Sequence, residues 1–278
     1  MLVVIRGAGD IATGIALRLY RAGIRLVLTD LPQPTSIRRT VCFSEAIRLG
    51  ETVVEGVHAR RADSAAEAAT LTEQGIIAVL ADPAAGCVQE LHPDALVDAI
   101  LAKKNLGTHI TNAPIVIAVG PGFTAGKDVH LVIESMRGHN LARIITDGMA
   151  QPNTGVPGNI AGFTSERVIH APAAGYIYDV RKIGDIVQKG DEIARIYPDK
   201  GSYDNKLSEY VPVNATITGI IRGLIREGYY FKEGFKIADI DPREGELSNC
   251  FTISDKARSI AGSVLEAVSA FEHGIRVY

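Results

Sequence analysis

A glycine turn near the start of the chain has residue types suited to holding a diphosphate. The sequence GAGDIA over residues 7–12 fits the pattern G-x-G-x-x-A. In this pattern the first glycine permits a tight turn, the second lets a pyrophosphate approach the backbone, and the small third residue lets a helix pack on a strand. Asp30, 21 residues after Gly9, stands where an acid can accept hydrogen bonds from ribose hydroxyls. The motif therefore predicts either a bound dinucleotide-type ligand or a turn kept for structure alone.

Two arginines follow that acid in a proline-rich loop, DLPQPTSIRRT. Arg38 and Arg39 could hold a further phosphate or the second half of a ligand, because guanidinium groups bind phosphate through paired hydrogen bonds. A solvated basic pair explains the same two residues equally well.

A second glycine loop, GPGFTAGKD, begins at Gly120. It differs from a nucleoside-triphosphate loop, because Pro121 occupies the place of the first required glycine and Asp128 replaces the magnesium-binding Ser or Thr. Its backbone N–H groups could still face an anion. The predicted cofactor-binding residues are Gly7, Gly9, Asp10, Ile11, Ala12, Asp30, Arg38, Arg39, Gly120 and Gly122.

Three further polar residues could hold a metal or a polar ligand. His130 and Glu134 are four apart, which places them on one face of either a helix or a strand. His139 follows shortly after. The set lacks a strict metal-ligand spacing, so ordinary surface or core positions remain an alternative to a metal or ligand site. No catalytic residue is identified.

These residues are positioned by an alternation of strands and helices. An apolar run over 2–5, helical spacing from 11 to 23, and a second apolar run over 26–28 predict one strand–helix–strand unit. Further strands are expected over 52–59, 76–80 and 114–119, with helices over 62–74 and 93–104.

The second half contains an internal repeat. A shift of 44 residues lays AGYIYDVRKIGDIVQKGDEIARI onto TGIIRGLIREGYYFKEGFKIADI, with four small residues matching. These paired sets of short strands resemble the biotinyl/lipoyl-like barrel-sandwich fold. In that fold a modified lysine occupies a tight hairpin between the halves, whereas Lys200 and Lys206 lie in a longer polar connection. We therefore expect no covalent biotin or lipoate. A final amphipathic helix is predicted after Ser254.

The predicted fold class is α/β: a Rossmann-like doubly wound sheet, then a mostly β barrel-sandwich (biotinyl/lipoyl-like) domain and a C-terminal helix. The expected divisions are a dinucleotide-binding domain over 1–150, a junction loop over 151–166, the barrel-sandwich domain over 167–243, and a helical segment over 244–278.

Composition narrows the class of protein. The 29 Lys and Arg against 32 Asp and Glu provide no positive field for nucleic acid. Arg6 and Asp10 interrupt the apolar start, and no run approaches the roughly 18 apolar residues of a membrane span. A cytoplasmic protein without a membrane partner is expected, with a homo-oligomer left open. The cysteines are far apart and are expected to be buried apolar residues; they are Cys42, Cys87 and Cys250.

Three stretches together resemble a known family: VIRGAGDIATGIALRL, APIVIAVGPGFTAGKDVHLVIESMRGHNLARII and PNTGVPGNIAGFTSERVIHAPAAGYI. They are similar to the YqeB-type accessory proteins of selenium-dependent molybdenum hydroxylase systems, and the middle one also to XdhC-like proteins. The resemblance implies a maturation factor whose partners are an apo molybdenum hydroxylase and other maturation proteins. The glycine turn and Asp30, and not the family, make a dinucleotide-type ligand the expected one, either NAD or molybdopterin dinucleotide.

Two other functions fit the same residues. A NAD-dependent oxidoreductase would need a proton-transfer residue beside the nicotinamide, and residues 1–150, which carry the glycine turn, contain no Tyr-x-x-x-Lys pair. The pair Tyr178 and Lys182 has this spacing but lies in the repeat of the second half. A protein-binding scaffold would need no small ligand.

Overall fold

A computed structural model describes residues 1–152, 155, 158–207 and 209–277. The predicted junction loop over 151–166 includes residues 153–154 and 156–157, which lie outside the described residues. The contacts divide the chain into two compact units. Unit 1 comprises Met1–Pro34, Val41–Thr154 and Ile253–Tyr278, and unit 2 comprises Thr35–Thr40 and Gly155–Thr252.

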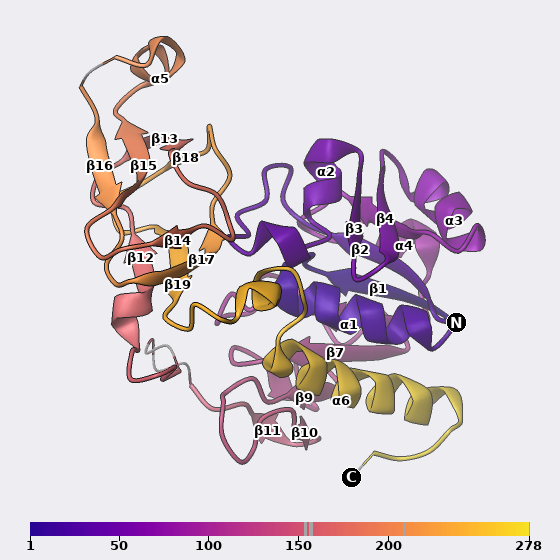
Figure 1. The fold of residues 1–278 in the computed structure, drawn as a ribbon. Helices are drawn as coiled ribbons and strands as arrows, with labels where there is room; N and C mark the ends of the chain where they lie inside the picture. The colour runs from indigo at the N-terminus through magenta and orange to yellow at the C-terminus, as the bar shows by residue number, and fades with distance from the viewer. Residues whose placement is uncertain (153–154, 156–157, 208, 278) are drawn as a thin grey trace. The chain divides into compact units, whose positions relative to one another are not determined.

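Unit 1 is built on a nine-stranded mixed sheet (Figure 1). Its strands are β1 (Leu2–Arg6), β2 (Arg25–Thr29), β3 (Glu51–Val54), β4 (Val57–Ala62), β5 (Ile77–Leu80), β6 (Ala95–Asp98), β7 (Ile115–Val119), β9 (Leu131–Ile133) and β10 (Ile144–Ile145). They lie in the order β10-β9-β7-β6-β1-β2-β5-β4-β3. The edge strands β3 and β10 are antiparallel to their neighbours, and the strands between them are parallel. A small separate sheet pairs β8 (Thr124–Ala125) with β11 (Gly148–Met149).

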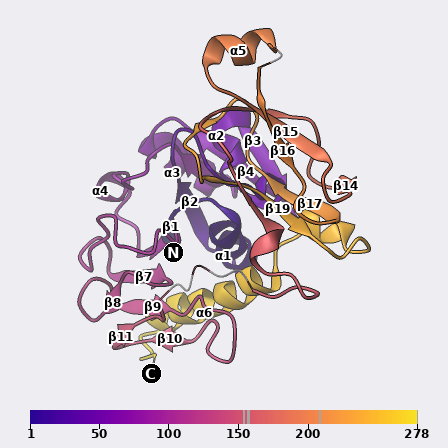
Figure 2. The same ribbon diagram turned by 90° about the vertical axis from the view of Figure 1, so that its left-hand side faces the viewer.

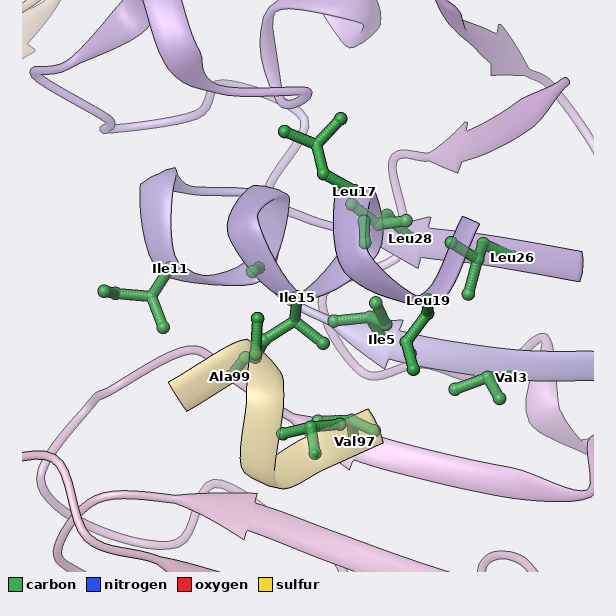
Figure 3. Close-up of a cluster of buried hydrophobic side chains, with 14 of the residues drawn as sticks. Val3, Ile5, Ile11, Ile15, Leu17, Leu19, Leu26, Leu28, Val97 and Ala99 are labelled. Atoms are coloured by element: carbon green, nitrogen blue, oxygen red, sulfur yellow. The ribbon is translucent and has the colours of Figure 1, made fainter. Parts of the chain in front are cut away.

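Helices cover both faces of this sheet. They are α1 (Asp10–Arg21), α2 (Glu45–Leu49), α3 (Ala65–Glu73), α4 (Val88–Leu91) and α6 (Asp255–Glu272). Helices α1 and α6 lie side by side, although they come from opposite ends of the chain (Figures 1 and 2). Ile15 of α1 lies beside Ile5 of β1 and Ala99, which follows β6 (Figure 3), and Ile11 and Val97 belong to the same buried cluster. The apolar spacing of α1 thus becomes a core-facing stripe.

Unit 2 consists of two four-stranded sheets. Its strands are β12 (Val168–His170), β13 (Gly175–Asp179), β14 (Ile186–Val187), β15 (Glu192–Tyr197), β16 (Val211–Asn214), β17 (Gly219–Leu224), β18 (Tyr230–Phe231) and β19 (Lys236–Asp241). The sheet orders are β12-β19-β17-β14 and β16-β15-β13-β18. Helix α5 (Lys200–Asn205) stands between β15 and β16 in the chain.

The 44-residue offset is kept in the backbone of unit 2. The starts of β13, β14 and β15 recur 44 positions later at those of β17, β18 and β19. Equivalent hydrogen bonds recur with them, since Gly184 N donates to Ile221 O and Gly228 N donates to Ile177 O, each at 2.8 Å. Each copy places its two-residue strand in the other copy's sheet, so the copies bury apolar residues that neither could cover alone.

The predicted fold class is wrong. The main sheet is mixed, and no helix among the described residues joins β6 to β7 or β7 to β9. The helix beside α1 is α6, which enters from the C-terminal end of the chain instead of connecting two neighbouring strands. The second half forms two separate sheets, and the protein is a mixed α/β structure with several sheets.

Two predicted elements are also wrong. The helix expected over 93–104 contains the central strand β6, whose four residues are all buried. A short apolar sequence has the same pattern whether it forms a buried strand or part of a buried helix. Periodicity therefore could not distinguish a strand from a helix at this position. The strand expected over 52–59 is a hairpin, because Glu55 and Gly56 both adopt positive φ and turn the chain.

No helix within the described ranges is long and apolar enough to cross a membrane. Cys42, Cys87 and Cys250 are all buried and form no disulfide in the described part of the chain.

Candidate functional site

Several predicted site residues meet at the carboxyl ends of the parallel strands of unit 1. The first glycine turn follows β1, Asp30 follows β2, Gly120 follows β7 and Glu134 follows β9. Ligands of open α/β sheets bind at this edge, where neighbouring strands lead away in opposite directions. We call the group Gly7–Ala12, Asp30, Glu134 and Lys256 the carboxyl-edge site.

Two backbone N–H groups of the turn that follows β1 already donate hydrogen bonds within the protein. Gly7 N donates to Thr29 O at 2.7 Å, and Ala8 N donates to Asp30 Oδ2 at 2.8 Å. Gly7 has φ +108°, and a Cβ there would lie 3.0 Å from Ala99 O. The glycine is therefore required by the close approach of two backbone segments. Burial raises the pKa of Asp30, while hydrogen bonds from Leu31 and Ala8 N–H groups lower it.

Helix α1 begins at this turn without a side-chain cap. Its N-cap residue is Gly9, whereas Ser64, Asp199 and Ser254 accept backbone hydrogen bonds at the starts of α3, α5 and α6. The first turn therefore presents backbone N–H groups and the positive end of the helix dipole. The side chains of Ile11 and Ala12 are buried in the core, so only their backbone can serve a ligand, and Ile11 N already donates to Asp10 Oδ1 at 3.0 Å.

Lys256 in the first turn of α6 is a member of the site that sequence reasoning missed. Lys256 is half-buried. Burial lowers the pKa of its ammonium group most, and the positive charge of Arg137 lowers it further. The negative charges of Asp10, Glu134 and Asp255 oppose this shift. Arg137 is bound through two hydrogen bonds to Asp255, at 2.7 and 2.9 Å. A lysine in the first turn of a helix opposes the helix dipole. This unfavourable placement was the available sequence signal.

A second missed group closes the end of β6. Asp98 is buried, accepts a hydrogen bond from Thr108 Oγ1 at 2.6 Å, and lies 3.6 Å from the Arg6 guanidinium. Burial raises the pKa of Asp98, and this effect exceeds the lowering by the hydrogen bonds from Thr108 and Ile100 and by the positive charge of Arg6. Arg6 also donates to Leu106 O at 2.8 Å, which fixes the loop after β6.

The second glycine loop packs against the protein itself. A Cβ at Gly120 would lie 2.7 Å from Ser135 Oγ, and one at Gly122 would lie 2.6 Å from Lys104 Cα. Both glycines adopt positive φ. The backbone around Lys104 covers Gly122, so these glycines serve close chain packing.

The possible metal ligands do not converge. His130 precedes β9 and its Nδ1 accepts a hydrogen bond from Val116 N at 2.9 Å, while Glu134 follows the same strand. Burial lowers the pKa of His130, which favours the neutral ring that this bond requires. Glu134 accepts hydrogen bonds from Met136 N at 2.7 Å and Gln151 N at 2.8 Å. His139 is exposed in a loop.

No group of three or more His, Cys, Asp or Glu in the described residues could hold a metal ion.

The predicted arginine pair belongs to unit 2. Arg38 donates to the carbonyl oxygens of Asn249 and Thr252, at 2.9 and 3.1 Å. Arg39 donates to Leu224 O at 2.8 Å and forms an ion pair with Asp179 at 3.4 Å. Both side chains organise unit 2, and neither is a solvated surface cation.

A hollow of about 280 Å³ lies at the carboxyl ends of β4 and β5. Its polar lining comprises Arg61, Asp63, Ser64, Asp82, Cys87 and Glu90. Burial, with Asp82 adding to it, raises the pKa of the Cys87 thiol to about 12. The thiol is therefore protonated at neutral pH and does not act as a nucleophile.

Comparison with known proteins gives one near relative. No protein-family model matches the chain. The chain is 54% identical over 272 residues to a protein of Escherichia coli strain K12 described as uncharacterized protein YqeB. The match covers 98% of this chain and 48% of that protein, so the chain spans about half the length of its relative. This supports the YqeB part of the resemblance and not its selenium-dependent hydroxylase or XdhC-like parts.

Solved structures give distant matches. One is an aspartoacylase family protein of Mesorhizobium loti, 13% identical, covering 86% of this chain and 84% of that one at a TM-score of 0.31. Another is a succinylglutamate desuccinylase of Silicibacter sp. TM1040, 13% identical, with the same coverage and a TM-score of 0.27. Scores this low carry no argument for a hydrolase activity of this chain.

The functional prediction is corrected at this point. The relative is described as uncharacterized, and the matched structures are described as desuccinylase or aspartoacylase proteins. None of these descriptions supports the predicted role in maturation of selenium-dependent molybdenum hydroxylases, and that prediction is not retained. What the comparisons establish is similarity to the YqeB protein of Escherichia coli over nearly the whole of this chain.

Proposed function

We propose that unit 1 binds a dinucleotide-type ligand at the carboxyl-edge site, with a diphosphate at the start of α1. The observation that carries the proposal is the uncapped start of α1 at Gly9, with the Lys256 ammonium near enough to interact with Asp10. Backbone N–H groups at a helix N-terminus favour an anion, and a nearby cation strengthens that preference.

The charges of the site favour an esterified diphosphate over a terminal phosphate. Asp10 and Asp30 flank the turn, and each adds repulsion toward an incoming anion. A diphosphate ester carries one charge per phosphate, whereas a terminal phosphate carries nearly two at neutral pH. The proposed ligand therefore has its diphosphate between two ester groups, as in NAD.

The first test is a charge change at the helix start. Gly9 has φ −71° and ψ −173°, an extended conformation open to any residue. Gly9→Asp should cap α1 with its own carboxylate, maintaining or raising the melting temperature. The same carboxylate should repel a diphosphate, and we expect isothermal titration with NAD to show at least about tenfold weaker binding.

The second test removes the cation. Lys256→Met should weaken NAD binding by roughly tenfold, because a charged hydrogen-bonding partner contributes about 1.5–3 kcal/mol. Lys232→Met is the matched control, since that lysine is exposed in unit 2, and it should leave binding unchanged. Absence of NAD binding by the wild type, or equal affinity in Gly9→Asp, would refute the proposal.

A further inference from the structure

One edge of the nine-stranded sheet in unit 1 is open to a further strand. β10 is the outermost strand at this edge, and among the described residues it pairs with β9 alone (Figure 1). Its two residues, Ile144 and Ile145, are half-buried. The open side of an edge strand presents backbone N–H and C=O groups to which another strand can pair.

The backbone of β10 shows which residues are available for pairing. Glu134 N donates to Arg143 O at 2.9 Å, so the backbone of Arg143 faces β9. Alternate residues of an antiparallel strand direct their N–H and C=O groups to opposite sides. Ile145 therefore also faces β9 with its backbone, whereas the backbone groups of Ile144 and Thr146 are directed to the open side.

A hollow of about 960 Å³ lies along β10. Residues 142–147 form one wall, and α6 together with residues 275–277 forms the other. Its lining includes the apolar side chains of Ile144, Ala270 and Ile275, and Ile275 is 63% exposed. A strand added to this edge would find space in the hollow and would cover apolar surface, which favours association.

The residues around Ile145 are complementary to a second copy of themselves. In the sequence RIITD over 143–147, a base and an acid stand at equal distances on either side of Ile145. Two such segments paired antiparallel about Ile145 would set Arg143 of each copy opposite Asp147 of the other. The same register sets Ile145 opposite Ile145 and joins Ile144 to Thr146, whose backbone groups face the open side. Apolar pairs and opposite charges directly across from each other stabilise antiparallel strands.

The charges at the two edges of the sheet distinguish them. Arg143 and Asp147 are exposed, and within the described ranges neither side chain forms an ion pair or a hydrogen bond. At the other edge, β3 begins at Glu51 and is followed by Glu55. Antiparallel pairing of two β3 strands would therefore bring like charges together, which is unfavourable.

We propose that β10 pairs antiparallel with β10 of a second copy, so that unit 1 forms a two-fold symmetric dimer with one sheet continuing into the other. Such a contact uses the same surface on both copies, which requires that the surface be complementary to itself. The Arg143–Asp147 pairs and the central Ile145 pair meet that requirement. The dimer surface contains no residue of the carboxyl-edge site, so it is independent of the proposed dinucleotide binding.

Sedimentation equilibrium of the full chain measures the dimer. We expect the wild type to dimerise, with a dimer fraction that falls on dilution. Arg143→Asp should weaken dimerisation by at least about tenfold, because it sets like charges opposite each other twice in one contact. The double variant Arg143→Asp, Asp147→Arg restores opposite charges and should recover dimerisation. Val53→Lys is the control at the other edge, since Val53 of β3 is 48% exposed, and it should leave dimerisation unchanged.

A covalent link tests the register. In a pair without backbone hydrogen bonds between its members, opposite residues lie within the distance that a disulfide spans. Ile145→Cys should therefore give a disulfide-linked dimer on oxidation with diamide. The wild type should give none, because Cys42, Cys87 and Cys250 are buried. Met149→Cys is the matched control, since Met149 is 59% exposed but does not lie opposite itself in this register.

Three outcomes would overturn the inference. A wild type that stays monomeric up to roughly 100 μM would leave the edge to a strand of another protein. Dimerisation of Arg143→Asp as tight as that of the wild type would place the dimer contact on another surface. Linkage of Met149→Cys in preference to Ile145→Cys would exclude the register about Ile145.

Discussion

At the scale of single residues, the fold moves the ionisation of Asp179 into the neutral range. Burial raises the pKa of this carboxyl group to about 7, against the charge of Arg39, and Glu227 raises it further. Its Oδ1 is buried without a hydrogen-bond partner among the described residues. The protonated form is therefore favoured more strongly in the folded protein than in the unfolded chain.

Stability should consequently fall as pH rises through this residue's titration. Between the ordinary pKa of 3.8 and the folded value of about 7, the folded state keeps a proton that the unfolded chain has released. Asp179→Asn should flatten this dependence and raise the free energy of unfolding at pH 8 by roughly 1–3 kcal/mol, less than the full shift because the Arg39 ion pair is lost.

Chemical denaturation of wild type and variant at pH 5 and pH 8 measures the effect. Asp204→Asn is the control, since Asp204 forms an exposed ion pair with Lys200, and such pairs contribute little. An unchanged difference between the two pH values in Asp179→Asn would contradict the prediction.

At the scale of elements, unit 1 depends on a close contact between α1 and α6. A Cβ at Gly14 of α1 would lie 2.8 Å from Ala257 Cβ and 3.1 Å from Ile253 Cγ2. The absence of a side chain at Gly14 lets the two helices approach in this way. Small residues at a crossing allow two helix backbones to pack closely, because side chains otherwise set their separation.

Gly14→Ala should therefore destabilise the protein by about 1–3 kcal/mol, because overpacking outweighs the better helix propensity of alanine. Gly262→Ala in α6 is the matched control. No atom lies within 4 Å of its added Cβ, so it should stabilise the protein by about 0.5–1 kcal/mol. Thermal unfolding of both variants checks the opposite signs, and stabilisation by Gly14→Ala would show that the helices are not in close contact.

At the scale of the whole molecule, residues from the end of the chain complete a unit that begins at its start. Ile260, Val264 and Val268 of α6 are fully buried in the cluster that includes Ile15 and Val97. Each contributes about 1.5–3 kcal/mol when buried. Together they approach the net stability of a typical domain, about 5–15 kcal/mol.

A chain truncated after Thr252 should therefore lose the cooperative unfolding of unit 1. Amide hydrogen exchange should show β1, β6 and β7 deprotected, while β17 and β19 of unit 2 keep their protection, because their pairing involves residues before position 253. A truncation after Glu272 is the control, since it leaves α6 whole. Protected amides in β1 after the first truncation would contradict this dependence.

The two copies of the repeat in unit 2 share a backbone structure but carry different charged residues. Asp179 of the first copy corresponds to Gly223 of the second, and Arg195 corresponds to Asp239. The buried apolar positions are kept, whereas these charged positions differ between the copies. The two halves of the repeat therefore differ in where charged side chains stand.

Local patterns predicted the parts of the fold that depend on neighbouring residues. The strand over 2–5, the helix that follows and the strand over 26–28 correspond to β1, α1 and β2. The helix expected after Ser254 is present as α6, with Ser254 as its N-cap. These elements are encoded by periodicity and capping, which operate within a few residues.

The use of each polar residue was decided by distant contacts. Asp30 was expected to face a ribose, and in the structure it accepts a hydrogen bond from the turn that it was expected to assist. Lys256 joins the carboxyl-edge site because α6 packs beside α1, and Arg38 and Arg39 serve unit 2. No local pattern reports contacts between residues more than two hundred positions apart.

The sequence by itself determined the first strand–helix–strand unit, the 44-residue repeat and the composition of the glycine turn. Only the tertiary structure decided which amides of that turn are already bonded and which cation stands beside it. The physical reason is that backbone conformation responds to near neighbours, whereas hydrogen bonding, burial and electrostatics are settled by groups that folding brings together.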